Sequence, residues 1–187
     1  MKSQKRTPYF LLLSLLVASG ISILTTAKAA DSSSGSSQEV HQLLSQVKTV
    51  AIALEQDSAE LAGWTRQKTL TWQSHAAKLA EIKEHVNKAG ALLTQLNQAR
   101  EGASPWQHQA IDRIYPILKE LDDNTEATID HLNDNSANIH FAAYQDYAEA
   151  GYDLSKELTT LVSDYVDYGE HEEALRSLQD KLQPAGS

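Results

Sequence analysis

The sequence predicts an all-α protein folded as an antiparallel up-down-up-down four-helix bundle, on three observations. From residue 38 onward apolar residues recur at spacings of three and four, and no alternating segment is long enough to form a strand. Helix-forming residues are abundant, whereas the chain has 4 Pro, 8 Gly and 2 Phe. Turn signals divide the periodic part into four segments of about 25 to 35 residues, the usual helix length of such bundles.

The amino terminus has the pattern of a secretory signal peptide over residues 1–30. Three basic residues come first, a mainly apolar stretch follows over residues 9–24, and Ala-Lys-Ala at 27–29 supplies a cleavage pattern. We expect cleavage after Ala29 or Ala30 and export to the periplasm or the medium. The alternative is an uncleaved anchor, but the apolar stretch of about 16 residues is shorter than the ~20 that span a bilayer. Residues 31–37, DSSSGSS, are expected to form a flexible leader.

The first two helices are predicted from apolar stripes and glycine stops. The first covers residues 38–62 and ends before Gly63. The second begins between Arg66 and Thr71 and ends near Arg100, before Gly102. The expected core positions are Val40, Leu44, Val47, Ala51, Leu54, Ser58 and Leu61, followed by Trp72, His75, Leu79, Ile82, Val86, Ala89, Leu93 and Leu96.

The third and fourth helices complete residues 38–183 as one domain, with 184–187 as a tail. Ser104-Pro105 is a strong helix start, and Pro116 predicts a kink rather than an end because the apolar register resumes in phase. Residues 133–136 form a turn. The fourth helix either continues past Gly169 or breaks there before a last turn, and the break is the preferred expectation. The core positions are Ile111, Ile114, Leu118, Leu121, Thr125, Thr128 and Leu132, then Ala137, His140, Tyr144, Tyr147, Gly151, Leu154, Leu158, Leu161, Tyr165 and Tyr168.

Charge and cysteine content exclude several classes of protein. The chain has 16 basic and 25 acidic residues, and four of the basic ones precede residue 31, so the mature part carries 12 against 25, a formal charge of −13. Such a charge disfavours nucleic acid and anionic membranes as partners. With no cysteine, disulfides, thiolate metal sites, covalent haem attachment and a lipoprotein anchor are excluded. No stable membrane anchor is expected after cleavage, and the protein is expected to be a monomer or a homodimer.

The best candidate site lies where the first two and the last two helices connect, because these connections share one end of an antiparallel bundle. The candidate ligand-binding residues there are Trp72, His75, Thr128, His131, His140, Tyr144 and Tyr147. Neutral imidazoles bind metals and phenols donate hydrogen bonds, so the cluster is compatible with a ligand, a metal or a haem. The simpler interpretation is that this end of the bundle is exposed to solvent, with each aromatic or imidazole ring in the core and its polar atom in contact with water. At the opposite end, Trp106, Tyr165 and Tyr168 are expected to form an aromatic plug.

Known chemical motifs are missing. Di-iron bundles need Glu-x-x-His on two helices, and here no histidine has Glu three residues before it. The single Met is Met1, which removes His/Met haem ligation, while ligation by His75 and His140 stays geometrically conceivable. No nucleophile elbow, P-loop or His-Glu-x-x-His is present. We therefore predict no catalytic residue, no metal site and no cofactor.

Three segments, SPWQHQAIDRIYPIL, HLNDN and DYVDYG, resemble an uncharacterised family of bacterial exported helical proteins over roughly residues 64–169. The resemblance implies export and a helical bundle, and no activity, cofactor or site residue. The function predicted from the residues is a non-catalytic envelope protein that binds an unknown partner protein or small ligand. The alternative is a metal- or haem-binding carrier.

Overall fold

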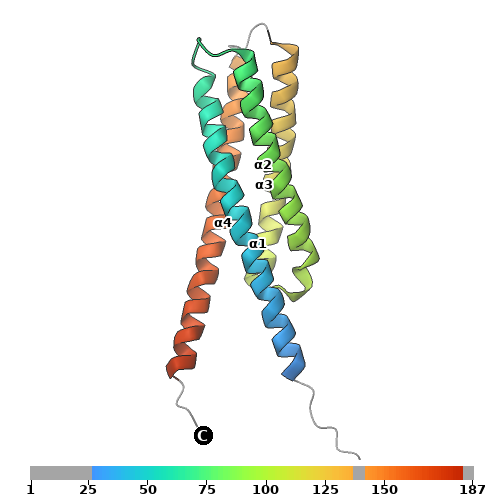
Figure 1. Cartoon of the computed structure of the whole chain (residues 1–187), viewed down its shortest axis with the longest axis vertical. Coiled ribbons are helices and arrows are strands. Elements are labelled where there is room, and N and C mark those ends of the chain that lie inside the picture. Colours follow the sequence, from blue (N-terminus) through green and yellow to red (C-terminus); the bar gives the residue numbers. More distant parts are fainter. Residues whose placement is uncertain (1–26, 137–141, 183–187) are drawn as a thin grey trace, which may run out of the picture.

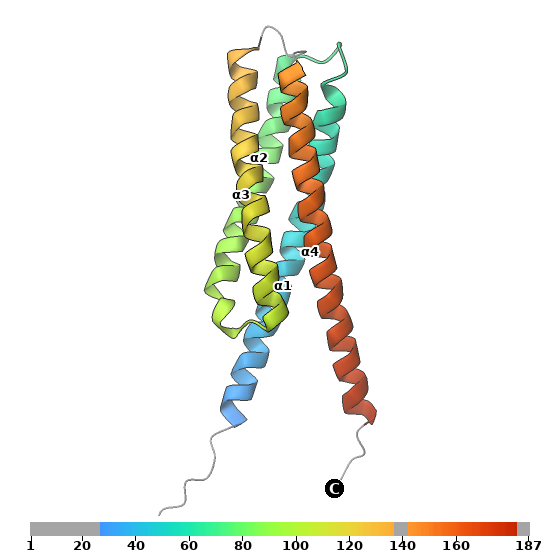
Figure 2. The ribbon, with the colours of Figure 1, turned by 180° about the vertical axis from the view of Figure 1, so that it is seen from behind.

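The computed structural model describes residues 27–136 and 142–182, with side chains from residue 37 onward. It contains α1 (Ala27–Trp64), α2 (Trp72–Gln98), α3 (Pro105–Asp134) and α4 (Ala142–Leu182), and a short 3-10 turn at Arg100–Gly102. Successive helices run antiparallel, with α1 and α3 each packed against both α2 and α4 (Figures 1 and 2). No strand occurs in this part of the chain, so the predicted four-helix bundle is confirmed.

The core is a column of aliphatic side chains along the common axis. Every core position predicted for the first and third helices is buried, and the second helix departs from the prediction at Trp72 alone. The fully buried residues include Val40, Leu44, Leu54, Leu96, Ile114, Leu121 and Leu158. Burying a side chain of this size stabilises the fold by about 1.5–3 kcal/mol, so these stripes fix the bundle in the absence of cysteine.

Local signals start α2 and α3 where the sequence predicts them. Thr71 is the N-cap of α2, and its side chain accepts a hydrogen bond from the amide of Ser74. Ser104 precedes Pro105, and its amide donates to Oε1 of Gln107 at 2.8 Å. Pro116 lies inside α3 without ending it, as the in-phase register predicted.

The first helix starts earlier than predicted. It begins at Ala27, so residues 31–37, which were expected to form a flexible leader, lie within α1 in the structure. A packed helix downstream removes the cost of nucleation. Extending that helix through residues 31–37 then costs about 0.5 kcal/mol for each Ser or Asp and about 1 kcal/mol for Gly35. Ser37 also has partners: its hydroxyl donates to Oε1 of Gln107 at 3.0 Å, and its carbonyl accepts from Nε2 of Gln107 at 2.7 Å.

The fourth helix differs from the prediction at Gly169, where the expected break is wrong. Helix α4 is continuous through this position, and Gly169 is buried in it. A Cβ there would lie 2.7 Å from Cη2 of Trp106 and 2.8 Å from Nδ1 of His41. The residue therefore allows α4 to approach these rings closely, and the tertiary contact outweighs the poor helix propensity of glycine.

The buried face of α4 is also rotated from its predicted stripe. Tyr147 and Tyr168 are exposed, while Ala148, Ser155 and Gly169 are buried. Small side chains such as these are weakly apolar, so they contribute little to the hydrophobic periodicity from which a buried face is predicted. They nevertheless permit close packing between helices.

Two helix ends extend beyond the rest of the bundle. The first turns of α1 and the last turns of α4 pass the connection between α2 and α3 and diverge from each other (Figures 1 and 2). On the α4 extension Leu175, Leu178 and Leu182 are 61%, 54% and 80% exposed. Among the described helices none is long and apolar enough to cross a membrane.

Candidate functional site

The predicted cluster forms at the α1–α2 end, where residues 65–71 connect the first two helices. Nδ1 of His75 in α2 lies 3.0 Å from the hydroxyl oxygen of Tyr144 in α4, and the two residues are 0% and 1% exposed. Their rings meet edge to face at 5.5 Å between centroids. Helices α2 and α4 face each other across the bundle axis, so this pair joins the two helices through the core.

Three further rings surround this pair. His131 of α3 stacks on Tyr144 at 6.2 Å with an interplanar angle of 13°, and it contacts Tyr147 at 5.5 Å. Trp64 at the end of α1 meets His75 edge to face at 6.0 Å. The structure therefore brings together four of the candidate ligand-binding residues, His75, His131, Tyr144 and Tyr147. Trp64 joins them, as its place at the end of the first predicted helix indicates.

The other predicted residues are placed differently. Trp72 is 40% exposed at the first turn of α2, outside the buried cluster. Thr128 is buried, but its hydroxyl donates to the carbonyl of Asn124 at 2.7 Å within α3. His140 lies outside the described residues.

The cluster is closely packed. The cavity beside it, lined by Ser58, Thr128 and Tyr147 among others, has a volume of about 10 Å³. A bound organic ligand needs a cavity of roughly a few hundred Å³, and a haem needs a cavity of similar volume. Burial raises the pKa of Tyr144 above its ordinary value, because the phenolate would lose its hydration. The described rings therefore act as a packed end of the core, with the Tyr144 phenol protonated at neutral pH.

The described residues contain no group of three or more His, Cys, Asp or Glu side chains placed to hold a metal ion. Ligation by His75 and His140 depends on a residue outside the described part. The metal- or haem-carrier alternative stays a prediction that this geometry does not favour.

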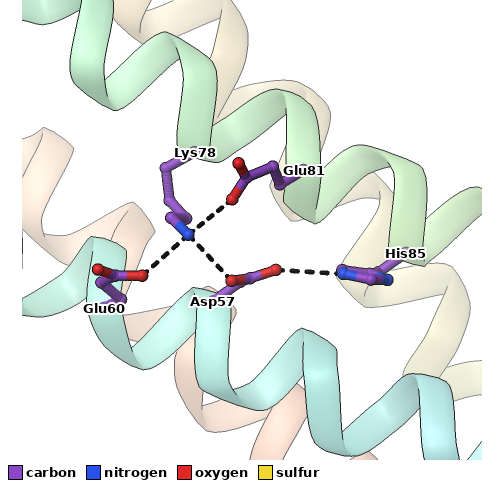
Figure 3. A network of polar contacts seen from close by, with 5 residues as sticks. All are labelled: Asp57, Glu60, Lys78, Glu81 and His85. Carbon is purple, nitrogen blue, oxygen red and sulfur yellow. Dashed lines mark hydrogen bonds and ion pairs between the residues drawn. The ribbon is translucent and has the colours of Figure 1, made fainter.

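A charged network joins α1 to α2 next to the cluster (Figure 3). Nζ of Lys78 lies 3.0 Å from Asp57, 2.9 Å from Glu60 and 2.6 Å from Glu81. Asp57 also contacts Nε2 of His85 at 3.2 Å. The Lys78 ammonium lies 5.6 Å from the centre of the Trp64 ring, which links the network to the aromatic cluster.

The network holds a partly buried cation. Burial by itself lowers the pKa of Lys78, but hydrogen bonds to Glu60, Glu81 and Asp57 outweigh it and raise the pKa above its ordinary value. The amino group is therefore charged at neutral pH and bridges both helices. Sequence analysis missed this network because the partners lie on two helices whose relative register is set only by packing.

A groove runs along α4 beside α3. It has a volume of about 610 Å³ and is lined by Arg113 of α3 and, on α4, by Asp153, Lys156, Glu157, Thr160, Leu161, Asp164, Tyr165 and Tyr168. The guanidinium of Arg113 lies 6.0 Å from the centre of the Tyr165 ring. The floor is thus apolar and aromatic, and charges of both signs stand at its edges. The groove was not predicted, since Tyr165 and Tyr168 were assigned to the core together with Leu161, and of these Leu161 alone is buried.

The aromatic plug expected at the α2–α3 end, where residues 99–104 connect the helices, is confirmed as a set of ring contacts. Trp106 stacks on Tyr165 at 6.4 Å with an interplanar angle of 12°, and it meets Tyr168 at 5.7 Å. His41 contacts the same indole at 6.3 Å. These contacts fix the position of α4 beside α3 and therefore shape the groove.

No family model, no curated protein and no solved structure matches this chain. The resemblance to exported helical proteins therefore stays a prediction.

Proposed function

We propose that this chain is an exported, non-catalytic bundle of the bacterial cell envelope that binds a partner protein through the groove between α3 and α4. The observation that carries the proposal is the groove itself, about 610 Å³ in volume. An open surface with an aromatic floor and charged edges is typical of a protein interface, whereas small-molecule sites are enclosed.

The packing at the α1–α2 end supports a binding role over an enzymatic one. Catalysis needs a cavity in which substrate meets an acid, a base or a nucleophile. His75 and Tyr144, the best candidates of that kind, are bonded to each other beside a cavity of about 10 Å³. His85 and Asp57 also form a pair, but Asp57 is shared with Lys78 in the network between α1 and α2.

Export is proposed from the signal-peptide pattern alone. Intact mass measurement of the protein purified from an envelope fraction tests it. A mass that corresponds to cleavage after Ala29 or Ala30 supports export with cleavage, and a full-length mass in the cytosolic fraction contradicts it.

The binding role is tested by photo-crosslinking in living cells. A photoreactive residue at Thr160, an exposed position in the groove, is expected to give covalent adducts that mass spectrometry identifies. The control is the same residue at Glu84, an exposed position on α2. Adducts from Thr160 and none from Glu84 support the proposal. Equal adducts from both positions, or none from either, contradict it.

A further inference from the structure

Helix α4 carries an apolar position that repeats every seven residues. The repeat runs through Leu154, Leu161, Tyr168, Leu175 and Leu182. A strict period of seven is the pattern of a helix that packs against another helix along its whole length. Inside the bundle α3 contacts one edge of this face, since Trp106 meets Tyr168 and Arg113 lies over the neighbouring Tyr165. The groove leaves the rest of the face open there.

Beyond the α2–α3 end the same face continues without cover from any described residue. Helix α3 starts at Pro105, and α1 diverges from α4 in this region (Figures 1 and 2). The exposed fraction rises from 8% at Leu161 to 49% at Tyr168 and 61% at Leu175. The groove and the exposed leucines are therefore two parts of one apolar face.

We propose that residues 175–182 of one copy dock antiparallel in the α3–α4 groove of a second copy, and that the second copy docks in the same way on the first. This inference rests on the proposed function, because it names the occupant of the groove as another copy of the chain. A two-fold arrangement of this kind is self-complementary, and it closes as a dimer.

The antiparallel register is set by the apolar residues. With Leu175 of one copy level with Tyr168 of the other, Leu178 comes level with Tyr165. The same register brings Leu182 level with Leu161. Each exposed leucine of the extension thus meets an apolar side chain of the groove, and the two α4 helices overlap over residues 161–182. At 1.5 Å per residue this overlap is about 33 Å long, a common length for a helix pair.

The charges agree with this register. In this register Lys181 of one copy is offset along the helix axis by two residues from Asp164 of the other copy and by five from Glu157. These offsets are about 3 and 7.5 Å at 1.5 Å per residue. These two carboxylates line the groove. Asp180 comes level with the part of the groove where Arg113 lies over Tyr165. Opposite charges therefore flank the docked end of the extension on both copies.

The expected strength is moderate. Each copy contributes one extension of about two turns and one groove, which is less area than the roughly 1,600 Å² of a standard stable interface. We therefore expect a dimer with a dissociation constant in the micromolar range, on the order of 1 to 100 μM.

The experiment is sedimentation velocity of the mature protein from about 1 to 500 μM, a range that brackets a micromolar constant. The expected result is a shift from monomer to dimer with rising concentration. Leu178→Glu is expected to raise the dissociation constant at least about tenfold, since it puts a carboxylate against Tyr165. Ile52→Glu, at an α1 residue of 48% exposure, is the matched control and is expected to leave it unchanged.

A charge swap tests the register. Lys181→Glu and Asp164→Lys are each expected to weaken dimerisation, and the double variant is expected to recover most of it. Circular dichroism checks that each variant is folded. A monomer at all concentrations, or equal effects of Leu178→Glu and Ile52→Glu, overturns the inference. If the monomer still crosslinks from Thr160 to a different envelope protein, the proposed function stands without the dimer.

Discussion

The hydrogen bond between His75 and Tyr144 joins two helices that are not neighbours around the bundle. Nδ1 of the imidazole lies 3.0 Å from the phenol oxygen, and both residues are buried. A contact of this kind fixes the distance between α2 and α4 across the bundle axis at the α1–α2 end. Hydrophobic packing alone sets this distance less precisely, because apolar side chains slide past one another more easily than hydrogen-bonded polar groups do.

Tyr144→Phe is therefore expected to lower the free energy of unfolding by about 1–3 kcal/mol, since it removes a buried hydrogen bond and keeps the ring. Urea unfolding followed by circular dichroism measures the change. Tyr147→Phe is the control, because Tyr147 is 36% exposed and its hydroxyl reaches water, and we expect less than about 0.5 kcal/mol there. Equal effects at the two tyrosines would show that the buried bond contributes nothing specific.

Gly90 in α2 and Gly169 in α4 are expected to respond in opposite directions to replacement by alanine. Gly90→Ala meets no atom within 4 Å, so it is expected to stabilise the protein by about 0.5–1 kcal/mol through helix propensity. Gly169→Ala puts a Cβ at 2.7 Å from the rigid ring of Trp106, and we expect a net loss of about 1–3 kcal/mol. Thermal unfolding of both variants checks the pair. A rise in melting temperature for Gly169→Ala would contradict the close packing of α4 on Trp106.

Removal of the network cation tests the link between α1 and α2. Lys78→Met leaves Asp57, Glu60 and Glu81 without the ammonium that they share, and the Lys78 side chain is only 11% exposed. We expect a loss of about 1–2 kcal/mol, less than for a fully buried pair because the glutamates reach solvent. Lys119→Met breaks an ion pair to Asp123 whose side chains are 60% and 64% exposed, and it should change stability by under about 0.5 kcal/mol. Denaturant titrations at low and high salt, which measure the free energy of unfolding, would distinguish the effect of Lys78→Met from that of Lys119→Met.

Stability is expected to fall in alkaline solution. The folded-state pKa values of Tyr144 and Lys78 both lie above their ordinary values of 10.0 and 10.5. Between the unfolded and folded pKa the unfolded chain binds fewer protons, so the stabilisation present below about pH 10 is lost as pH rises. Unfolding free energies measured from about pH 8 to 12 check the sign. Tyr144→Phe should flatten the decline, and an unchanged slope in this variant would exclude Tyr144 as its source.

Much of the bundle was predictable from residue order. The positions of Leu44, Ile82 and Leu121 follow a spacing of three and four, and each is buried as that spacing predicts. Ser104 and Pro105 marked the start of α3 correctly, because capping depends on a few adjacent residues. The meeting of His75 with Tyr144 also followed from antiparallel connectivity, which places both near the same end.

Several failures of prediction share one cause. Gly169 was expected to break α4, Tyr168 to be buried and Trp72 to join the cluster, and each depended on a neighbour from a distant segment. The Lys78 network and the groove beside Arg113 arise in the same way. Interhelical register and rotation decide these features, and a difference of one residue turns a helix face by about 100°.

The sequence by itself determined the class of fold, the number of helices and the acidic, cysteine-free character of the chain, because these follow from local periodicity and composition. The tertiary structure alone decided that the imidazole and phenol cluster is filled, that α4 stays continuous past Gly169, and that an open groove lies between α3 and α4. Apolar periodicity shows which face of a helix is buried, whereas packing between helices determines what each face contacts and whether space remains between them.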